Sequence, residues 1–502
     1  MSLALSLLPI FIVMMLLFIL KRSAVEAGAV ACITAAIVAL FSPSFSLNIP
    51  QLVDAGVKGV LITSVVAYVL IFGILLFHLM NEAGAIHAIA AFVSQATHHP
   101  TRQVLLLAVA FSPLVESASG FGLAMIVIAP ILITLGFDRL KATLISLLSL
   151  MVVPWGALAT GTVIGANLAD FPLQRLGTGS AILSIPVFLY LSCLIVLISG
   201  GFDALRKHFF EVLAVTGSLS GAIWFFNRYV SVELAGVFGA MTALAVELLW
   251  IHFMQKRHLD ASQKQETATG MTESRLSIFQ AMSAYILLIV LLFLTRIIPP
   301  IEHYLNSTGL LQFPRYDFTL PLFYSPGFYL FLVCIFSIFV FKLSRSAIQK
   351  SIKQTLKQFQ PVFLSTVGFV VMSQIMVEAG MVQMLSSSAA LFFGPAFLYV
   401  SPLIGGLGGF LTGSNTGSNA MFINLQLQTA QHLQMTPDLF AYAQNTSSSH
   451  LTMACPSRVV LAASIGKIPE QENQLLRSIA FAGIGTLVLI MLGVIVGQWF
   501  QL

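Results

Sequence analysis

Charged side chains are scarce in this chain of 502 residues. Asp, Glu, Lys and Arg together make up 9% of it, against 58% hydrophobic residues. So few polar side chains cannot cover a water-soluble globule of this size, and the mean hydropathy of +0.94 excludes that class. The chain is therefore expected to be a membrane protein in contact with the lipid bilayer.

Cysteine is scarce as well, and its placement excludes several kinds of site. Cys32, Cys193, Cys334 and Cys455 stand singly, without the spacing of a disulfide framework, a redox pair or a zinc site. We expect no metal, no cofactor and no catalytic centre. The sequence pI near 9.0 does not come from a basic, aromatic-interleaved soluble domain, so no nucleic-acid partner is expected.

Long apolar runs are abundant, many of them near the length of about 20 residues that crosses a hydrocarbon core. The first run, Leu3 to Leu20, is followed by Lys21-Arg22 and another apolar run without a small-residue cleavage site. We interpret it as a retained helix rather than a signal peptide. The sequence predicts an all-α polytopic fold of about 12 transmembrane helices, at roughly 3–20, 24–41, 58–80, 140–165, 180–198, 208–226, 233–252, 279–298, 326–342, 361–384, 440–465 and 478–500.

Two segments do not fit this scheme as simple spans. Residues 103–136 are interrupted by SPLVESASGFG, and residues 401–430 by GGFLTGSNTGSNA. The second interruption is small as well as polar, as backbone must be where it approaches a ligand closely. Non-helical backbone at membrane depth is tolerated only beside protein or a water-filled cavity. We expect each segment to be a re-entrant hairpin that enters and leaves the membrane on one side.

The positive charges set the expected orientation. With both hairpins re-entrant, 18 of the 24 Lys and Arg fall on one face and 5 on the other, while Arg458 lies inside a span. The positive-inside rule makes the richer face cytoplasmic, which places both termini on the non-cytoplasmic side of the cell (inner) membrane. The expected parts are a first half at 1–255, a cytoplasmic loop at 256–278, a second half at 279–502 and, within the second half, an external loop at 299–326.

The chain that follows each hairpin supports an internal repeat. Aligning Asp138 with Asp438 places a serine eleven residues on in both segments, at 149 and 449, with a proline shortly after each, at 154 and 456. Because the hairpins are expected to enter from opposite faces, this is an inverted repeat. Inverted repeats with broken helices near the midplane are typical of secondary transporters.

The same residues resemble a known family. GFLTGSNTGSNAMFINLQ, the later helix QNTSSSHLTMACPSRVVLAAS, and ESASGFGLAMIVIAPILITLGF in the first half are similar to motifs of the L-lactate permease family. The close matches cover about a quarter of the chain, and length and span count fit throughout. The resemblance implies a secondary transporter of small 2-hydroxy monocarboxylates such as lactate or glycolate, usually with protons.

The chain departs from the family pattern in three places. Asn415 stands where the family usually has Asp, Gly417 stands where it usually has Ser, and HLTMACPSR replaces the usual GKMISPQ. An Asn cannot take up and release a proton, so any coupling through that position must lie elsewhere or be absent. The third departure leaves the identity of the substrate open.

Two polar breaks offer groups that could bind a carboxylate. A carboxylate in a low-dielectric cavity needs hydrogen-bond donors or a positive charge, and a helix restarting behind the second tip would aim its N-terminal dipole at an anion. Small-residue packing between helices is the alternative interpretation. The candidate substrate-binding residues are Ser414, Asn415, Thr416, Gly417, Ser418 and Asn419 at the tip, Asn445, Thr446, Ser447, Ser448 and Ser449 in the broken helix, and Arg458.

Arg458 is the only arginine well inside a predicted span. An intramembrane arginine needs a partner, and a substrate carboxylate held in bidentate fashion is one. The alternatives are an ion pair with Glu116 or Glu378, or a helix that begins near Arg458 and leaves it at the interface. Among Asn445 to Ser449, one or two hydroxyls are expected to bond only to their own helix.

Three residues are candidates for proton coupling, namely Glu116, Glu378 and His450. Glu116 lies in the first hairpin tip with Ser117, Ser119, Gly120 and Gly122, where burial favours protonation of a carboxyl. Glu378 could instead be an interfacial residue, and His450 a hydrogen-bonded structural one. Pro154-Trp155-Gly156 and Thr160-Gly161-Thr162 break the span after the first hairpin and are expected to mirror the 445–449 break across the site.

The sequence therefore predicts a secondary transporter of small organic carboxylates, most simply lactate or glycolate with protons, working by alternating access around a midplane site. It leaves open another organic anion such as a dicarboxylate, sodium coupling or exchange, and assembly as a homodimer. A membrane-embedded enzyme would need a paired acid and base or a metal cluster, and neither is found. A channel is disfavoured because the hairpins form inverted repeats rather than a ring of filter loops.

Overall fold

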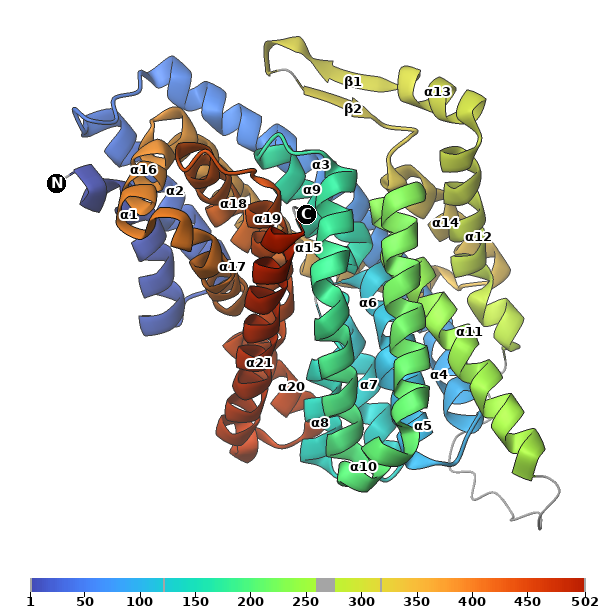
Figure 1. Cartoon of the computed structure of the whole chain (residues 1–502). Helices are drawn as coiled ribbons and strands as arrows, with labels where there is room; N and C mark the ends of the chain where they lie inside the picture. The colour runs from blue at the N-terminus through green and yellow to red at the C-terminus, as the bar shows by residue number, and fades with distance from the viewer. Residues whose placement is uncertain (1, 121, 259–275, 317, 501–502) are drawn as a thin grey trace.

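The computed structural model describes residues 2–120, 122–258, 276–316 and 318–500. Helices that run between an upper and a lower end make up nearly all of it (Figure 1). Within these ranges the only strands are β1 (Leu310–Phe313) and β2 (Phe318–Pro321), which pair antiparallel with Leu310 opposite Pro321. The prediction of an all-α polytopic membrane protein is confirmed.

Among the described residues, eight helices or helix runs are long and apolar enough to cross a membrane, or nine if one bent pair counts as a single span. The run of α16 into α17, introduced below, is one of them. Two shorter apolar helices occupy the predicted spans 3–20 and 326–342. The long helices are α2 (Ala24–Phe41), α3 (Ile49–Glu82), α10 (Leu173–Tyr229), α11 (Val232–His258), α12 (Ile278–Ile297), α15 (Arg345–Glu378) and α21 (Glu472–Trp499), and the shorter ones are α1 (Ser2–Met14) and α14 (Pro326–Val340).

Helix α10 contains two of the predicted spans, 180–198 and 208–226. Gly201 interrupts it with φ of 75° and ψ of −172°, a conformation that favours glycine. The chain reverses at this point, so α10 descends to the lower end of the molecule and returns (Figure 1). This joining of two spans is one reason why the number of long helices is smaller than the number of predicted spans.

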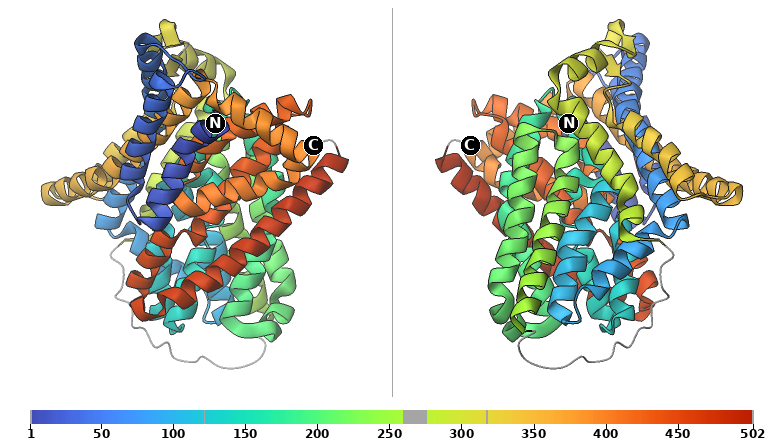
Figure 2. Two further views of the ribbon diagram at one scale, coloured as in Figure 1. Left: turned by 90° about the vertical axis from the view of Figure 1, so that its left-hand side faces the viewer. Right: turned by 90° about the vertical axis from the view of Figure 1, so that its right-hand side faces the viewer.

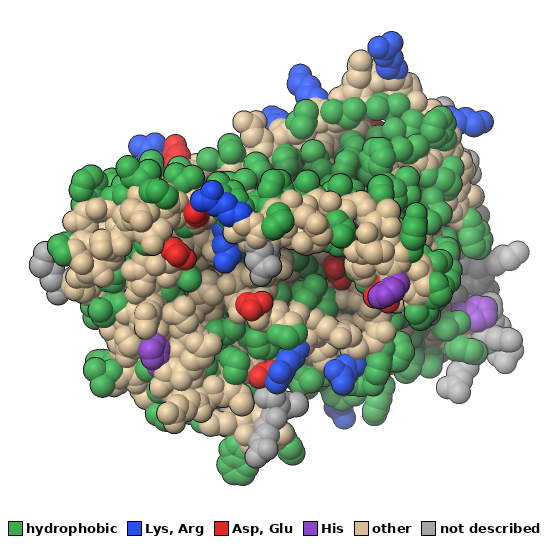
Figure 3. Space-filling model, turned by 90° about the horizontal axis from the view of Figure 1, so that it is seen from above, with side chains coloured by type: hydrophobic (Ala, Val, Ile, Leu, Met, Phe, Trp, Pro, Cys, Tyr) green, Lys and Arg blue, Asp and Glu red, His purple; other side chains and the backbone are tan. Residues whose placement is uncertain are grey.

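The upper end of the molecule carries both termini and the β1–β2 ribbon (Figure 1), and the turned views agree (Figure 2). Helix α13 (Pro299–Ser307) leads into the ribbon, which is tied to α3 where Arg315 Nη2 donates to Asp54 Oδ1 at 2.7 Å. Hydrophobic side chains are spread over much of the view from above, with charged side chains of both signs near its middle and further Lys and Arg at its edge (Figure 3). Helix α11 ends at the opposite, lower end. This arrangement agrees with a topology in which both termini share a face with the 299–326 loop.

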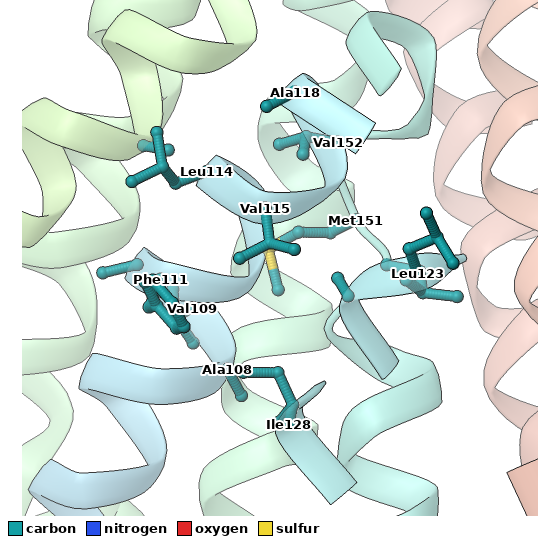
Figure 4. Close-up of a cluster of buried hydrophobic side chains, with 14 of the residues drawn as sticks. Ala108, Val109, Phe111, Leu114, Val115, Ala118, Leu123, Ile128, Met151 and Val152 are labelled. Atoms are coloured by element: carbon teal, nitrogen blue, oxygen red, sulfur yellow. The ribbon is translucent and has the colours of Figure 1, made fainter. Parts of the chain in front are cut away.

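The first hairpin rises from the lower end and returns to it (Figure 1). Its tip turns through Gly120 and Gly122, whose φ angles of 64° and 78° fit glycine best. Phe111 and Val115 are fully buried among apolar neighbours (Figure 4), so protein rather than lipid surrounds the tip. The elements are α4 (Ala85–Gln95), α5 (Pro100–Val104), a π-helical stretch (Leu105–Phe111), α6 (Ser112–Ser119) and α7 (Leu123–Thr134).

The second hairpin enters from the upper end (Figure 1). It is formed by α16 (Met381–Phe393), α17 (Phe397–Thr412) and α18 (Asn415–His432), with a turn at Gly394 between the first two. The tip turns at Gly413, φ 62°, and the Ser414 hydroxyl accepts the Gly417 N–H at 3.2 Å to cap α18. Neither hairpin is an uninterrupted helix, and the two enter from opposite ends, as predicted.

A broken span follows each hairpin at the predicted prolines. Helices α8 (Arg139–Leu148) and α9 (Gly156–Leu168) flank a 3-10 turn (Val153–Trp155) and form the bent pair, with an angle of 58°. Helices α19 (Asp438–Leu451) and α20 (Pro456–Gly466) flank a second 3-10 turn, Thr452–Ala454. Each break places helix ends, whose terminal backbone groups lack partners within their own helix, in the interior of the protein.

Helix lengths and packing show the inverted repeat. Helices α3 and α15 are both 34 residues long and both end in Glu-Ala-Gly, with Gly84 and Gly380 at φ of 76°. Helix α2 packs on α15 as α14 packs on α3. Lys350, near the start of α15, places Nζ 2.7 Å from Oε1 of Glu82 at the end of α3, so the paired helices run antiparallel. The repeat thus extends upstream of the hairpins, beyond the segments in which the sequence indicated it.

Candidate functional site

The two hairpin tips, the first broken span and Arg458 of α20 line a small cavity of about 30 Å³. Such a volume holds little more than a water molecule or two, so a six-heavy-atom carboxylate would require the tips to separate. The lining side chains come from segments up to about 340 positions apart in sequence, by the numbering of the chain. They are Glu116, Val153, Gly156, Thr160, Gly161, Ser414, Asn415, Thr416 and Arg458.

Arg458 lies between the two tips. It is 8% exposed, and its Nη2 donates to the Gly413 carbonyl of the second tip at 2.8 Å. A Cβ placed on Gly122 of the first tip would lie 3.6 Å from its guanidinium, so the arginine also packs against that turn. Its Nη1 has no hydrogen-bond partner in the part of the chain that the structure describes. Nη2 therefore holds the second hairpin tip, and Nη1 is available to bind an anion.

The alternative partners of Arg458 do not form ion pairs with it. No ion pair between Arg458 and Glu116 or Glu378 occurs among the described residues. Glu378 is exposed at the end of α15 and does not line the cavity. The third alternative, a helix that begins near Arg458, does occur, since α20 starts at Pro456, but it starts inside the protein rather than at an interface.

Glu116 is fully buried and also lines the cavity. Its Oε1 accepts the Gly122 N–H at 3.0 Å, and a Cβ on Gly156 would lie 3.5 Å from the same oxygen. Its Oε2 has no hydrogen-bond donor among the described residues. A buried carboxylate oxygen without a donor is costly, so this carboxyl needs either a proton or a nearby cation. Arg458 supplies a positive charge close enough to interact with it electrostatically.

A buried amide cluster joins the second hairpin to both broken spans. Asn415 and Asn419 donate from Nδ2 to Asn445 Oδ1 at 3.0 and 2.9 Å. Asn445 in turn donates to Ser180 Oγ at 2.9 Å and to Thr162 Oγ1 at 3.1 Å. Because these amides largely satisfy one another, the cluster positions the tip, while Asn415 also reaches the cavity wall.

The family model for L-lactate permease matches residues 2–320 and 314–500 of the chain. The chain belongs to the L-lactate permease family. This membership makes it a multi-pass membrane transporter and not an enzyme.

Individual relatives of this permease cover most of its length. An L-lactate permease of Streptococcus iniae is 24% identical over 424 residues, covering 82% of this chain and 88% of the relative. The glycolate permease GlcA of Escherichia coli is 23% identical over 549 residues, covering 98% and 96%. The permease is also similar to the Alcanivorax borkumensis YdaH transporter of known crystal structure, at 13% identity and a TM-score of 0.48 over 87% of this chain and 85% of that one.

The serine run of the broken helix in this permease divides by its contacts. Ser448 donates to Asn415 Oδ1, which links it to the cavity wall. Ser447 and Ser449 donate to carbonyls of their own helix, at 2.6 and 2.7 Å. The Thr446 hydroxyl is buried and without a partner among the described residues. Of the second-tip residues, Ser414, Asn415 and Thr416 line the cavity, whereas Gly417, Ser418 and Asn419 lie behind them.

Other predicted site residues of the permease lie away from the cavity. His450 is buried with Nε2 3.1 Å from Ser184 Oγ and its ring against Phe188. Ser117 packs against Gly236 of α11, and Ser119 donates to a carbonyl of its own helix. These placements favour structural roles for the three side chains.

The mirror break after the first hairpin does contribute to the cavity. Gly156, Thr160 and Gly161 line it, whereas none of residues 445–449 is among the lining residues. Position 161 requires glycine because the Asn415 side chain packs directly against it, and a Cβ there would lie 2.5 Å from Asn415 Nδ2. Val153 and the hydrogen-bond partner Ser180 were not among the predicted residues. Neither carries a local signal, since an apolar residue in a span and a serine in a helix are both ordinary.

Proposed function

We propose that this permease is a secondary active transporter of small 2-hydroxy monocarboxylates, lactate or glycolate, driven by protons across the cell membrane. The observation that carries the proposal is Arg458, buried between the two hairpin tips with one nitrogen held and one free at the cavity. The names of the relatives, L-lactate permease and glycolate permease, agree with it.

The substrate carboxylate would bind Nη1 of Arg458. A guanidinium fits a carboxylate better than any other cationic side chain does, because both groups are planar. Ser414 and Thr416, on the same wall, offer hydroxyl groups for the substrate. Arg458 is the only positive residue among those that line the cavity, which favours one carboxylate over two and so disfavours a dicarboxylate.

Proton coupling would act through Glu116. With Oε2 free of donors and the carboxyl fully buried, the protonated form is favoured whenever no cation balances its charge. A substrate carboxylate bound at Arg458 would neutralise the guanidinium that otherwise balances the charge of Glu116. Glu116 would then take up a proton, so substrate and proton would bind together. Asn415, which cannot titrate, would serve as a hydrogen-bonding wall, and sodium coupling is the alternative that the assay below separates.

Transport would proceed by alternating access, with the tips moving against the remaining helices. The halves at 1–255 and 279–502 would be the two repeats, and the face rich in Lys and Arg would be cytoplasmic. The cavity lies where the tips of hairpins from opposite faces meet, so moving one tip opens it to one side only.

The test uses the purified permease in liposomes loaded with a pH-sensitive dye. An inward lactate gradient is expected to acidify the interior with or without sodium, and glycolate should compete, whereas succinate should not. Protein-free liposomes control for diffusion of the neutral acid. Uptake that requires sodium and leaves the internal pH unchanged would refute proton coupling. Absence of lactate and glycolate uptake under all gradients would refute the substrate.

A further inference from the structure

A second group of buried titratable side chains lies outside the cavity, at the lower end where α5, α10 and α11 pack together (Figure 1). Glu211 on the rising part of α10 is 3% exposed. Its Oε1 accepts from Arg102 Nε at 3.0 Å, and its Oε2 lies 2.6 Å from His208 Nδ1. Arg102 belongs to α5, the first arm of the first hairpin, so this carboxylate joins the hairpin to α10.

Glu247 on α11 completes the group. It is fully buried, and neither of its carboxyl oxygens has a hydrogen-bond donor among the described residues. Its carboxyl faces that of Glu211 within hydrogen-bonding reach, with Arg102 near enough to interact electrostatically. Two carboxyl groups can bond to each other only if one of them carries a proton.

The charges of the group balance with one such proton. Arg102 and Glu211 cancel, so a neutral Glu247 leaves the group uncharged, whereas an ionised Glu247 adds a buried negative charge beside another carboxylate. Adjacent carboxylates of this kind share a proton rather than ionise together.

The remaining charged and titratable neighbours do not supply a counter-ion. His99 precedes α5, and its ring centroid lies 4.7 Å from that of His208. Partial burial, and then the neighbouring His208 and Arg102, lower the pKa of His99 below its usual range, which favours the neutral ring; Lys207 adds to the same effect. Within the part of the chain that the structure describes, Arg102 is the only lysine or arginine that forms an ion pair with Glu211, and none forms one with Glu247.

We propose that Glu211 and Glu247 form a second proton-binding site, in which one proton is held between the two carboxyl groups. The proton keeps α10 and α11 together at the base of the first hairpin and leaves Glu211 free to hold Arg102. Loss of the proton at alkaline pH sets two carboxylates against each other and opens this contact. The site is separate from Glu116 and does not depend on which substrate is transported.

Infrared spectroscopy of the purified full-length permease in liposomes tests the shared proton directly. At neutral pH the carbonyl band of a protonated carboxylic acid is expected to be present, to disappear in Glu247→Gln, and to remain in the matched control Glu233→Gln on the same helix. In Glu211→Gln the band is expected to be lost too, because Glu247 would then ionise as the partner of Arg102. A band that survives in Glu211→Gln, or a spectrum unchanged by Glu247→Gln, overturns the proposal.

Thermal unfolding as a function of pH gives a second measurement. At neutral pH the folded permease would hold this proton, whereas both glutamates of the unfolded chain would already be ionised. The free energy of unfolding should therefore fall as the pH rises from neutral. Glu247→Gln keeps the size of the side chain and can donate a hydrogen bond to Glu211, so it should fold and show a weaker fall than the wild type. Equal pH dependence of the unfolding temperature in both proteins contradicts the shared proton.

Discussion

Replacing Arg458 by lysine tests the substrate site most sharply. The guanidinium donates through Nη2 to the Gly413 carbonyl, and its Nη1, without a partner among the described residues, would bind the substrate carboxylate. A lysine keeps the positive charge but is a point charge without the planar fork. We therefore expect Arg458→Lys to lose one of the two interactions while the protein still folds.

The expected magnitude follows from the interaction lost. A hydrogen bond to a charged group contributes about 1.5–3 kcal/mol, and each 1.4 kcal/mol is about tenfold in affinity. The KM for lactate in proteoliposomes should therefore rise roughly 10- to 100-fold in Arg458→Lys, with a smaller change in the maximal rate. Arg458→Ala removes both interactions and leaves the Gly413 carbonyl without its donor, so uptake should be abolished.

The matched control is Arg477→Lys, because Arg477 is exposed near the start of α21 and away from the cavity. Its KM should be unchanged. Protein yield and unfolding temperature of each variant separate loss of binding from loss of folding. If Arg458→Lys transports with wild-type KM and Arg458→Ala still takes up lactate, the carboxylate does not bind this arginine and the reasoning is refuted.

Three further predictions concern coupling and packing. Glu116→Gln should transport lactate down its own gradient but no longer acidify the liposome interior, whereas unchanged acidification would exclude Glu116 as the coupling residue. Asn415→Asp should make uptake more strongly dependent on low pH, since only a protonated Asp can replace the amide donor to the neighbouring Asn445; a flat pH profile counts against this. Gly409→Ala should lower the unfolding temperature, because its Cβ would lie 1.9 Å from the Ser448 carbonyl oxygen on α19 and overpacking costs about 1–3 kcal/mol or more, while Gly217→Ala, with open space around it, should not.

Much of the topology was predictable because membranes constrain sequences strongly. The length of apolar runs, the distribution of Lys and Arg, and two small polar interruptions were enough to predict two hairpins entering from opposite faces. Arg458 could be found for the same reason, since an arginine inside a span is rare and needs a partner. These signals are local in sequence and can be read from one chain.

Features that depend on contacts between distant segments were not predictable. Ser180 is ordinary for its helix, and nothing in the sequence indicates its contact with Asn445. Glu211 and Glu247 are unusual within apolar spans, but the sequence does not indicate that they lie beside each other. The turn at Ala157, Leu158 and Ala159 was missed for a different reason. All three have positive φ, a conformation that costs L-residues about 1–2 kcal/mol each, so no local preference could indicate it. A Cβ on Gly120 would lie 2.6 Å from that of Ala157, so this turn packs closely against the first hairpin tip.

The position of Arg458 has a consequence for the transport cycle. Its guanidinium is bonded to the backbone of one tip and packed against the turn of the other, although the tips belong to hairpins from opposite faces. If the tips move as proposed, withdrawal of either one would expose the same side chain, first to one compartment and then to the other. A single residue would therefore meet the transported anion in both compartments, so selectivity for import and for export could not evolve independently.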